Sequence, residues 1–398
     1  MRNEENTSIR SGIVGSGFAA RFHIEALRKV YGVNVEIVGV YSPTEKNCTA
    51  FAGANNLHSF KDLKSLIDVS DIVHICTPPS SHELVAVEAL SRNKYVVIEK
   101  PFTGYFGEGE KDFSGDDFNR QRGLQKAKES VQKLLKAEAG SEGQICYAEN
   151  WVYAPGIQKE KEILVKTGAQ IIWMHGEEAH SGSHSPFYGI WSFSGGGSIM
   201  GKAVHPLGAA LYLKQIEGLV SQGRPIRPVS VSARTHAVTR SKNFRNLGFI
   251  KSEYTDIEDF GTMHIVFEDG MFADIIASEL VLGGVHNWIE ITANNHRTRV
   301  NINPNTAMKT FNPKNSQFDD IYTVEKIETK EGWTNISPDE DWFTGYQNEI
   351  QDFYQCAATG NKPQSNSILA ADTILTVYTA YCSAAQGGSE VKIPFEIL

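Results

Sequence analysis

Several short stretches of this sequence combine residue types that could bind a phosphate group and move a proton. The first, Gly12-Ile-Val-Gly15-Ser-Gly17-Phe-Ala-Ala20, follows a short apolar run and opens a helical pattern. Gly15 permits a tight turn, Gly17 lets the backbone approach a pyrophosphate, and Ala20 lets the helix pack closely on a sheet. Free N–H groups at the start of such a helix bind phosphate. The stretch therefore predicts a dinucleotide-binding loop made by Gly15, Ser16, Gly17, Phe18 and Ala19.

The residues after the second predicted strand bear on the choice of dinucleotide. NAD sites usually place an acidic residue there, which binds the ribose 2′-OH, whereas an arginine accommodates the 2′-phosphate of NADP. This chain has Tyr41-Ser42-Pro43-Thr44 at that point, and Lys46 is the nearest cation. We expect Ser42 to contact the cofactor, and the sequence leaves NAD and NADP as open alternatives.

Two further turns follow predicted strands, at the sheet edge where ligands of open α/β sheets bind. In Glu99-Lys100-Pro101, the lysine can polarise a hydroxyl or carbonyl group and share its proton, although an isolated surface lysine would do neither. In Cys76-Thr77-Pro78-Pro79-Ser80-Ser81-His82, the prolines end the strand. We expect Thr77, Pro78, His82, Glu99 and Lys100 to border the cofactor. His82 fits equally well the exposed start of a helix.

The elements that position these turns alternate through the first 100 residues. Apolar, β-branched runs at 9–14, 35–41, 71–77 and 95–99 are separated by helical patterns at 19–30, 46–55, 61–68 and 81–93. This alternation predicts a parallel sheet covered on both faces, hence a doubly wound Rossmann domain over residues 1–145. Residues 104–123 interrupt the pattern with Gly, Asp and Glu, and they predict a solvent-exposed insertion.

The character of the chain changes near residue 146. Strand-like runs at 170–178, 229–238, 259–267, 271–282 and 288–292 dominate, and Asp269-Gly270 marks a tight hairpin. Residues 343–386 carry two helical patterns separated at Pro363. We therefore predict a second domain over 146–398 with a largely antiparallel sheet.

Composition narrows the function class. The chain has 398 residues, 41% of them hydrophobic, and a formal net charge of −9. An acidic, mixed-sign protein of this size is typical of a soluble globular protein and argues against nucleic acid as the main partner. Five scattered cysteines without CxxC spacing, together with the absence of an apolar run long enough for a bilayer, predict a cytoplasmic protein without membrane partners.

The order and register of these motifs resemble the glucose–fructose oxidoreductase, inositol dehydrogenase and rhizopine-catabolism (Gfo/Idh/MocA) family. The resemblance rests on the Gly15–Ala20 loop, the Thr77–His82 turn, Glu99-Lys100-Pro101, and Gly195-Gly196-Gly197 leading to His205-Pro206-Leu207. It implies NAD(P)-dependent chemistry at a carbinol carbon of a sugar, cyclitol or glycoside. It also implies that the Rossmann domain is followed by an α/β domain over 146–398, whose large open, mostly antiparallel sheet binds substrate. The resemblance further implies a homo-oligomer, a dimer or tetramer.

The same resemblance suggests roles for individual residues. Lys100 matches the motif lysine of the family, His205 matches its catalytic histidine, and Asn150 resembles an active-site asparagine. The family commonly has an aspartate four residues before that histidine, where this chain has Gly201, and a later aspartate of the same helix is replaced by Gly208. Three alternatives follow. Lys100 and His205 suffice for catalysis without the aspartate, another acid replaces it, or the activity has diverged from that of the family.

Residues 173–186 form a histidine-rich stretch with three alternative interpretations. His180 and His184 flank Ser-Gly-Ser, a loop pattern that does not suit helical metal chelation. Contacts with sugar hydroxyls are the favoured interpretation, ahead of a metal site or a purely structural loop, so we predict no bound metal. Together with Asn150, we expect Tyr153, His180, His184 and Lys202 to contact substrate.

These patterns predict an NAD(P)-dependent dehydrogenase with Lys100 and His205 as its acid–base groups. A redox-neutral lyase or glycosidase that keeps its NAD tightly bound is the second interpretation, prompted by Gly201 and the histidine-rich stretch. A non-enzymatic cofactor-binding protein is the third. Retention of both Lys100 and His205 argues against it.

Overall fold

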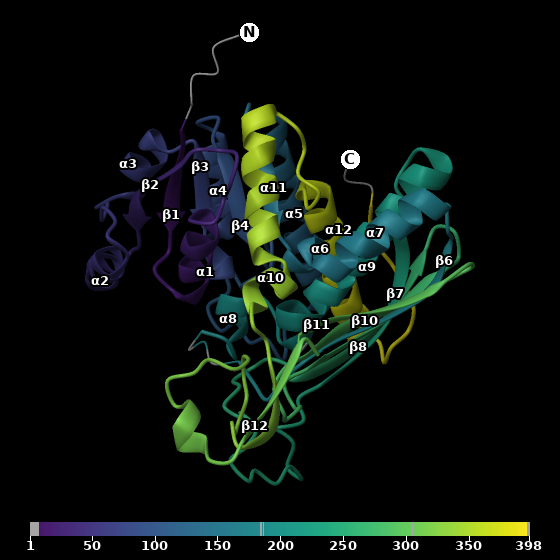
Figure 1. Ribbon diagram of the computed structural model, residues 1–398. Helices are drawn as coiled ribbons and strands as arrows, with labels where there is room; N and C mark the ends of the chain where they lie inside the picture. The colour runs from purple at the N-terminus through teal and green to yellow at the C-terminus, as the bar shows by residue number, and fades with distance from the viewer. Residues whose placement is uncertain (1–7, 184, 186, 304–305, 396–398) are drawn as a thin grey trace.

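The structure is a computed structural model, and it describes residues 8–183, 185, 187–303 and 306–395. Its two main sheets confirm the predicted fold class, a Rossmann domain followed by an α/β domain with a mostly antiparallel sheet. Figure 1 shows the two sheets with helices packed around them.

The first sheet has five parallel strands in the order β2-β1-β3-β4-β5. The strands are β1 (Ile9–Val14), β2 (Val35–Tyr41), β3 (Ile72–Ile75), β4 (Tyr95–Glu99) and β5 (Ile145–Ala148). The helical segments between them are α1 (Phe18–Leu27), α2 (Glu45–Asn55), α3 (Leu63–Val69), η1 (Pro79–Ser81), α4 (His82–Leu90) and α5 (Arg120–Ala139). All four residues of β3 are buried, as expected for a parallel strand with helices over both faces.

The second sheet has seven strands in the order β11-β10-β6-β9-β8-β7-β14. They are β6 (Ile171–Ala179), β7 (Pro228–His236), β8 (Phe260–Phe267), β9 (Phe272–Ser278), β10 (His286–Ala293), β11 (Arg297–Asn303) and β14 (Val391–Lys392). Strands β6 and β9 pair in parallel, and the other pairs are antiparallel. Helices α7 (Pro155–Thr167) and α9 (Val204–Gln222) lie over one face of this sheet (Figure 1).

The last helices pack against elements of both halves of the chain. Helix α11 (Tyr346–Thr359) contacts α1 and the short α6 (Asn150–Tyr153), and α12 (Ser367–Ala385) contacts α5, α9 and β7. Among the described helices, α12 alone is long and apolar enough to cross a bilayer, but 83% of its apolar window is buried in the fold. Helix α12 is therefore buried in the way that a core helix of a globular domain is buried.

Smaller elements complete the fold. Strands β12 (Met308–Asn312) and β13 (Gly332–Ile336) pair as a separate two-stranded sheet. The remaining short segments are α8 (Trp191–Ser194), η2 (Ile199–Ala203), η3 (Asn315–Phe318) and α10 (Glu340–Thr344).

The prediction of a solvent-exposed insertion at residues 104–123 is wrong for the aromatic residues of that segment. Tyr105 is buried and packs edge-on against Phe113 and Phe118, and Phe118 packs on Trp191. The aromatic residues are irregularly spaced among glycines and charges, so they give no periodic signal, yet their burial fixes the segment.

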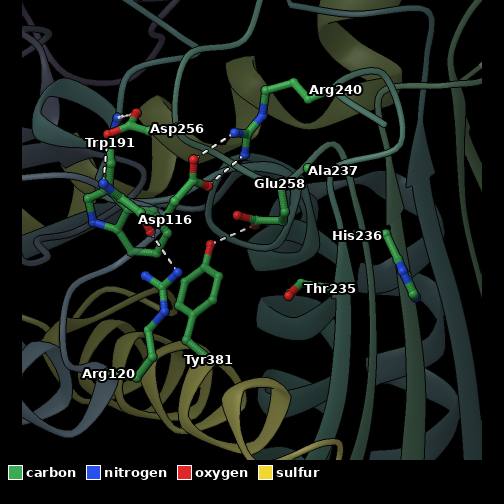
Figure 2. A pocket seen from close by; sticks show the side chains of 11 residues that line it. Asp116, Arg120, Trp191, Thr235, His236, Ala237, Arg240, Asp256, Glu258 and Tyr381 are labelled. Carbon is green, nitrogen blue, oxygen red and sulfur yellow. Dashed lines mark hydrogen bonds and ion pairs between the residues drawn. The ribbon is translucent and has the colours of Figure 1, made fainter. Parts of the chain in front are cut away.

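Ion pairs also fasten this segment to the second half of the chain. Arg240 makes two 2.7 Å hydrogen bonds to the carboxylate of Asp116. Arg120 donates to the carbonyl oxygen of Gly115 and stacks its guanidinium 4.6 Å from the ring centre of Trp191. Figure 2 shows these groups around a small polar cavity of about 110 Å³.

Candidate active site

The loop between β1 and α1 has the features of a phosphate-binding turn. Gly15 has φ +116°, and a Cβ there would lie 2.4 Å from the carbonyl oxygen of Cys76, so only glycine fits. Gly17 precedes α1 without a side-chain cap, and a Cβ there would meet nothing within 4 Å. The first N–H groups of α1 therefore border open space without a capping side chain. This arrangement fits the pyrophosphate of a nicotinamide dinucleotide.

The neighbouring cofactor candidates lie along the same sheet edge. The Ser16 hydroxyl donates to the Ser42 hydroxyl at 3.1 Å, which joins the ends of β1 and β2. Phe18 is exposed at the start of α1 and packs edge-on against Phe22. Ala19, beside it, is half-buried. The start of helix α1, whose N–H groups would bind a dinucleotide, is thus surrounded by Ser16, Ser42 and the exposed Phe18.

His82 joins two turns instead of facing an open site. It is fully buried, with Nδ1 3.0 Å from the carbonyl oxygen of Pro101 and Nε2 2.9 Å from that of Thr77. Burial lowers the pKa of its imidazole. The alternative of an exposed helix start is therefore wrong for this side chain. His82 ties the turn after β3 to the turn after β4, and so helps position Thr77, Pro78 and Lys100.

Lys100 is held between the two halves of the fold. Its backbone N–H donates to Glu99 Oε2 at 3.0 Å, and Glu99 Oε1 pairs with His23 Nε2 at 2.9 Å. Burial alone would raise the pKa of Glu99, but the hydrogen bond to His23 and the charges of His23 and Lys100 lower it. Glu99 is therefore an anion that fixes the backbone from which Lys100 extends.

The side chain of Lys100 reaches the segment that carries His205. Its Nζ donates to the carbonyl oxygen of Gly201 at 2.9 Å. Gly201 lies in η2, which is a π-helical turn, a feature frequent at functional sites. In that register Gly201 would accept from the N–H of the residue five positions on, but Pro206 has none. This leaves the carbonyl available for Lys100.

His205 is paired with a carboxylate at the end of β5. Its Nδ1 lies 2.7 Å from Glu149 Oε1, and its ring stacks on Trp151 with a centroid distance of 6.0 Å. Burial lowers the pKa of His205 to about 4 and raises the pKa of Glu149 well above its ordinary value. Burial disfavours charge on either group before the reaction. With Nδ1–H donating to Glu149, Nε2 carries the lone pair that can accept a proton.

A second carboxylate faces the other ring nitrogen. Glu178 Oε2 lies 3.9 Å from His205 Nε2, and that oxygen is buried without a hydrogen-bond partner. Burial raises the pKa of Glu178, an effect opposed by the charges of His205, Lys100 and Lys202. The ring nitrogen that can exchange a proton thus lies near the Glu178 carboxylate, and the charges of Lys100 and Lys202 act on the same ring.

Comparison with known proteins finds a family match in the N-terminal part of the chain. Residues 9–111 match the family model for the oxidoreductase family with an NAD-binding Rossmann fold, GFO_IDH_MocA. This stretch is similar to the Gfo/Idh/MocA oxidoreductases, and the family match covers less than half of the chain. The predicted resemblance is confirmed.

Individual relatives agree with this assignment. A stretch of 90 residues, 23% of this chain, is 37% identical to glucose-6-phosphate 3-dehydrogenase of Bacillus subtilis (strain 168). The chain covers only 25% of the length of that relative. Its likeness to two solved structures shows the fold over nearly the whole chain.

The first of these structures is GenD2 from gentamicin A biosynthesis in complex with NAD, at a TM-score of 0.75 and 18% identity, covering 99% of each chain. The second is myo-inositol 2-dehydrogenase from Lactobacillus plantarum, at a TM-score of 0.69 and 19% identity, covering 98% of this chain and 100% of the other.

The two glycines that depart from the Gfo/Idh/MocA pattern have a structural explanation. A Cβ on Gly201 would lie 2.6 Å from the ring of Tyr188, and a Cβ on Gly208 would lie 2.8 Å from Cγ of Glu149. Side chains from elsewhere therefore fill both positions. The carboxylate beside His205 comes from the end of β5, so the open alternative that another acid replaces the aspartate is the one this geometry favours.

The expected substrate residues divide into two groups. Asn150 and Tyr153 are buried and bonded within the protein: Asn150 donates to the carbonyl oxygen of Thr344, and the Tyr153 hydroxyl donates to Asp352 at 2.8 Å. Lys202 and His180 approach different oxygens of the Glu279 carboxylate, with nitrogen–oxygen distances of 2.5 and 3.8 Å, and the charge of Lys202 also acts on His205. His184 lies outside the described residues.

Sequence reasoning missed Glu149 and Glu178. Glu149 lies two residues after Tyr147, on the same face of the strand that leads to Asn150, and Glu178 lies inside the histidine-rich stretch. Both are acids near a sheet edge, but nothing in the sequence shows that they face His205. Within the described ranges, no group of three or more His, Cys, Asp or Glu residues is arranged to hold a metal ion.

Proposed function

We propose that this protein is an NAD(P)-dependent dehydrogenase acting at a carbinol carbon of a sugar, cyclitol or glycoside. The observation that carries the proposal is the convergence of Lys100 and His205. Lys100 Nζ donates to the carbonyl oxygen of Gly201, which lies one helical turn before His205. The turn that holds Lys100 lies at the same edge of the first sheet as the phosphate-binding loop. The family of residues 9–111 and the named relatives support the same reaction class.

The cofactor would be held by residues of the 1–145 domain. We assign its pyrophosphate to the N–H groups after Gly17, with Ser16, Phe18 and Ala19 around it and Ser42 on the ribose side. Bound NAD(P) supplies the hydride acceptor in oxidation and the hydride donor in reduction. No carboxylate or guanidinium of the 41–44 turn selects between the two cofactors.

The chain itself supplies proton transfer and orientation. In the oxidative direction, His205 Nε2 accepts the proton of the substrate hydroxyl, and the Lys100 ammonium stabilises the negative charge that develops on the oxygen. Glu149 holds His205 Nδ1 at 2.7 Å, which fixes the ring orientation and the tautomer. In reduction, the same two groups return the proton.

Residues 146–398 would bind the rest of the substrate. Glu178 and Lys202 border His205 and can accept from and donate to sugar hydroxyls, and His180 lies beyond them. The internal bonds of Asn150 and Tyr153 suit a structural role better than substrate contact.

The same region would form subunit contacts. The sheet face away from α7 and α9 carries Trp173, Phe272 and Trp288, which fits a homo-oligomer. The five described cysteines are free and buried, which fits a reducing, cytoplasmic location.

A substrate screen tests the proposal. Purified protein is incubated with NAD or NADP and a panel of sugars, cyclitols and glycosides, and formation of reduced nicotinamide is followed by absorbance. The proposal expects turnover that depends on added cofactor. Stoichiometric bound cofactor together with turnover that needs no added NAD(P), through elimination or glycoside cleavage, would contradict it.

A further inference from the structure

Three lysine side chains from separate parts of the sequence meet at one turn beside the proposed active site. Lys326 Nζ donates to the carbonyl oxygen of Gly182 at 3.1 Å, and Lys251 Nζ donates to the carbonyl oxygen of Ser183. Lys202 Nζ lies 3.4 Å from the hydroxyl oxygen of Ser183. The three ammonium groups therefore surround a two-residue segment, and we call them the lysine cluster.

The carboxylates close to the lysine cluster carry less charge than its three ammonium groups. Glu279 is fully buried and pairs with Lys202 at 2.5 Å. Among the residues that the structure describes, the other carboxylate within 4 Å of these ammoniums is Glu325, which lies 3.9 Å from Lys326 and is 45% exposed. Three cations thus face two carboxylates, of which only Glu279 is buried and in close contact, although the protein as a whole carries a net charge of −9.

The groups packed around Glu279 do not remove this imbalance. The hydroxyl groups of Tyr188 and Tyr254 donate to Glu279 at 2.6 and 3.3 Å, and His180 Nδ1 lies 3.8 Å from it. These neighbours are neutral or cationic. Burial lowers the pKa of Lys326, and the charges of Lys202 and Lys251 lower it further. An added anion would relieve this repulsion.

The lysine cluster borders the reacting groups. Lys202 follows Gly201, whose carbonyl oxygen holds the Lys100 ammonium, and Lys202 interacts electrostatically with His205 and Glu178. Lys251 and Lys326 are linked to Lys202 through the 182–183 turn. A substrate whose hydroxyl faces His205 could extend toward the lysine cluster.

We propose that the substrate is anionic: a sugar or cyclitol that carries a phosphate or carboxylate group, which binds to Lys202, Lys251 and Lys326. The inference rests on the proposed dehydrogenase function and specifies its substrate class. Lysine ammoniums bind phosphate and carboxylate oxygens by charge-assisted hydrogen bonds. A neutral sugar would leave the two partly buried cations Lys251 and Lys326 with backbone carbonyls as their main partners.

The test compares matched substrates on matched variants. Hexoses, their 6-phosphates and the corresponding hexuronates are assayed with NAD and NADP, together with inositol and inositol phosphates. The wild type is compared with Lys251→Met and Lys326→Met, which keep the apolar stems. Lys242→Met, which removes an exposed lysine of the preceding loop, is the control for a change of net charge.

We expect an anionic substrate to have the higher kcat/KM in the wild type. In Lys251→Met and Lys326→Met, its KM should rise roughly 10-fold to 100-fold, as for the loss of a hydrogen bond to a charged group. The KM of a neutral analogue should change little, and Lys242→Met should resemble the wild type. Phosphate esters and uronates tested side by side identify which anion the cluster binds.

Two other outcomes are decisive in different ways. If neutral substrates are turned over as well as anionic ones, and both variants leave that preference unchanged, the anion site is wrong and the dehydrogenase proposal stands. If no substrate reduces the cofactor, the proposed function fails, and calorimetric titration of the NAD-loaded protein with hexose 6-phosphate decides the anion site by itself. Binding that is lost in Lys326→Met supports the site, and absence of binding to the wild type overturns it.

Discussion

His205 Nδ1 and Glu149 Oε1 lie 2.7 Å apart, and both side chains are buried. Glu149 is the last residue before α6, whereas His205 lies in the first turn of α9, so the pair links the two halves of the fold. Its carboxylate occupies the space that a side chain at Gly208 would need. The orientation of the proposed base therefore depends on a residue 56 positions away in the sequence.

Replacement of Glu149 by glutamine should lower turnover without unfolding the protein. The amide can donate to Nδ1, which favours the tautomer with the proton on Nε2 and removes the lone pair that accepts the substrate proton. We expect a loss of about 10²–10⁴-fold in kcat, with cofactor affinity little changed.

Glu160→Gln is the matched control for this experiment. Glu160 is also fully buried and pairs with His296 at 2.7 Å, but the pair lies between α7 and the turn before β11, and we assign it no part in the reaction. This variant should keep normal turnover. Equal losses of kcat in both variants would show that breaking any buried Glu–His pair impairs the enzyme.

The protonation of His205 can be followed directly. Burial lowers its pKa to about 4, so the imidazole should stay uncharged between about pH 5 and 8, where an ordinary histidine titrates. NMR of histidine-labelled protein, with the signal assigned by its loss in His205→Gln, should show no protonation shift in that interval. A midpoint near 6.5 would contradict the buried neutral base.

Gly17 and Gly15 should respond differently to an added side chain. Gly17→Val has open space around the new Cβ and a backbone φ of −98°, so the protein should fold but lose NAD(P) binding, because the side chain occupies the phosphate approach. Gly15→Val meets the carbonyl of Cys76 and a positive φ, so it should be destabilised as well. Calorimetric cofactor titration and thermal unfolding separate the two effects. Normal titration in Gly17→Val would reject the loop assignment.

Glu258 should make folding stability depend on pH. Its carboxylate accepts from the N–H of Gly197 and from the Tyr381 hydroxyl at the cavity of Figure 2, and burial raises its pKa from 4.5 to about 6. A raised folded-state pKa contributes stability below pH 4.5 that is lost as the pH rises through about 6.

Chemical denaturation of the wild type and Glu258→Gln measures this contribution. The difference in unfolding free energy, wild type minus variant, should fall by about 2 kcal/mol between pH 4 and pH 7. A difference that stays constant would mean that Glu258 has the same pKa in the folded and unfolded protein, and one that grows would mean that its pKa is lowered by folding; either result would contradict the raised pKa.

The sequence predicted the parts of the fold that depend on local pattern. Continuous apolar runs between helices identified β1 to β4, and the glycine spacing identified the loop at Gly15 and Gly17. Strand β11 was missed because Arg297–Asn303 alternates charged and apolar residues only weakly, and the β12–β13 pair was missed for a similar reason. Burial of the 104–123 segment depends on distant partners such as Trp191, which no local pattern reveals.

The candidate site was predictable only where a motif marks it. Lys100 and His205 stand in recognisable motifs, but Glu149 faces His205 only because the ends of β5 and α9 meet in three dimensions. Asn150, adjacent in sequence, donates to Thr344 instead. A shift of one residue along an element exchanges a site residue for a structural one, and sequence spacing alone does not show which face is turned inward.

The most direct measurement is the rate of hydride transfer in Lys100→Met. Single-turnover formation of reduced nicotinamide is recorded for the wild type, for Lys100→Met, and for Lys94→Met as a control. Lys94 directly precedes β4, at the opposite end of that strand from Lys100. Lys100 Nζ is bonded to Gly201 beside His205, so its loss removes the cation at the reacting oxygen. We predict that the rate falls about 10²–10⁴-fold in Lys100→Met while the NAD(P) dissociation constant and the Lys94→Met rate stay near wild type. A near-normal rate in Lys100→Met on the true substrate would contradict the proposed mechanism.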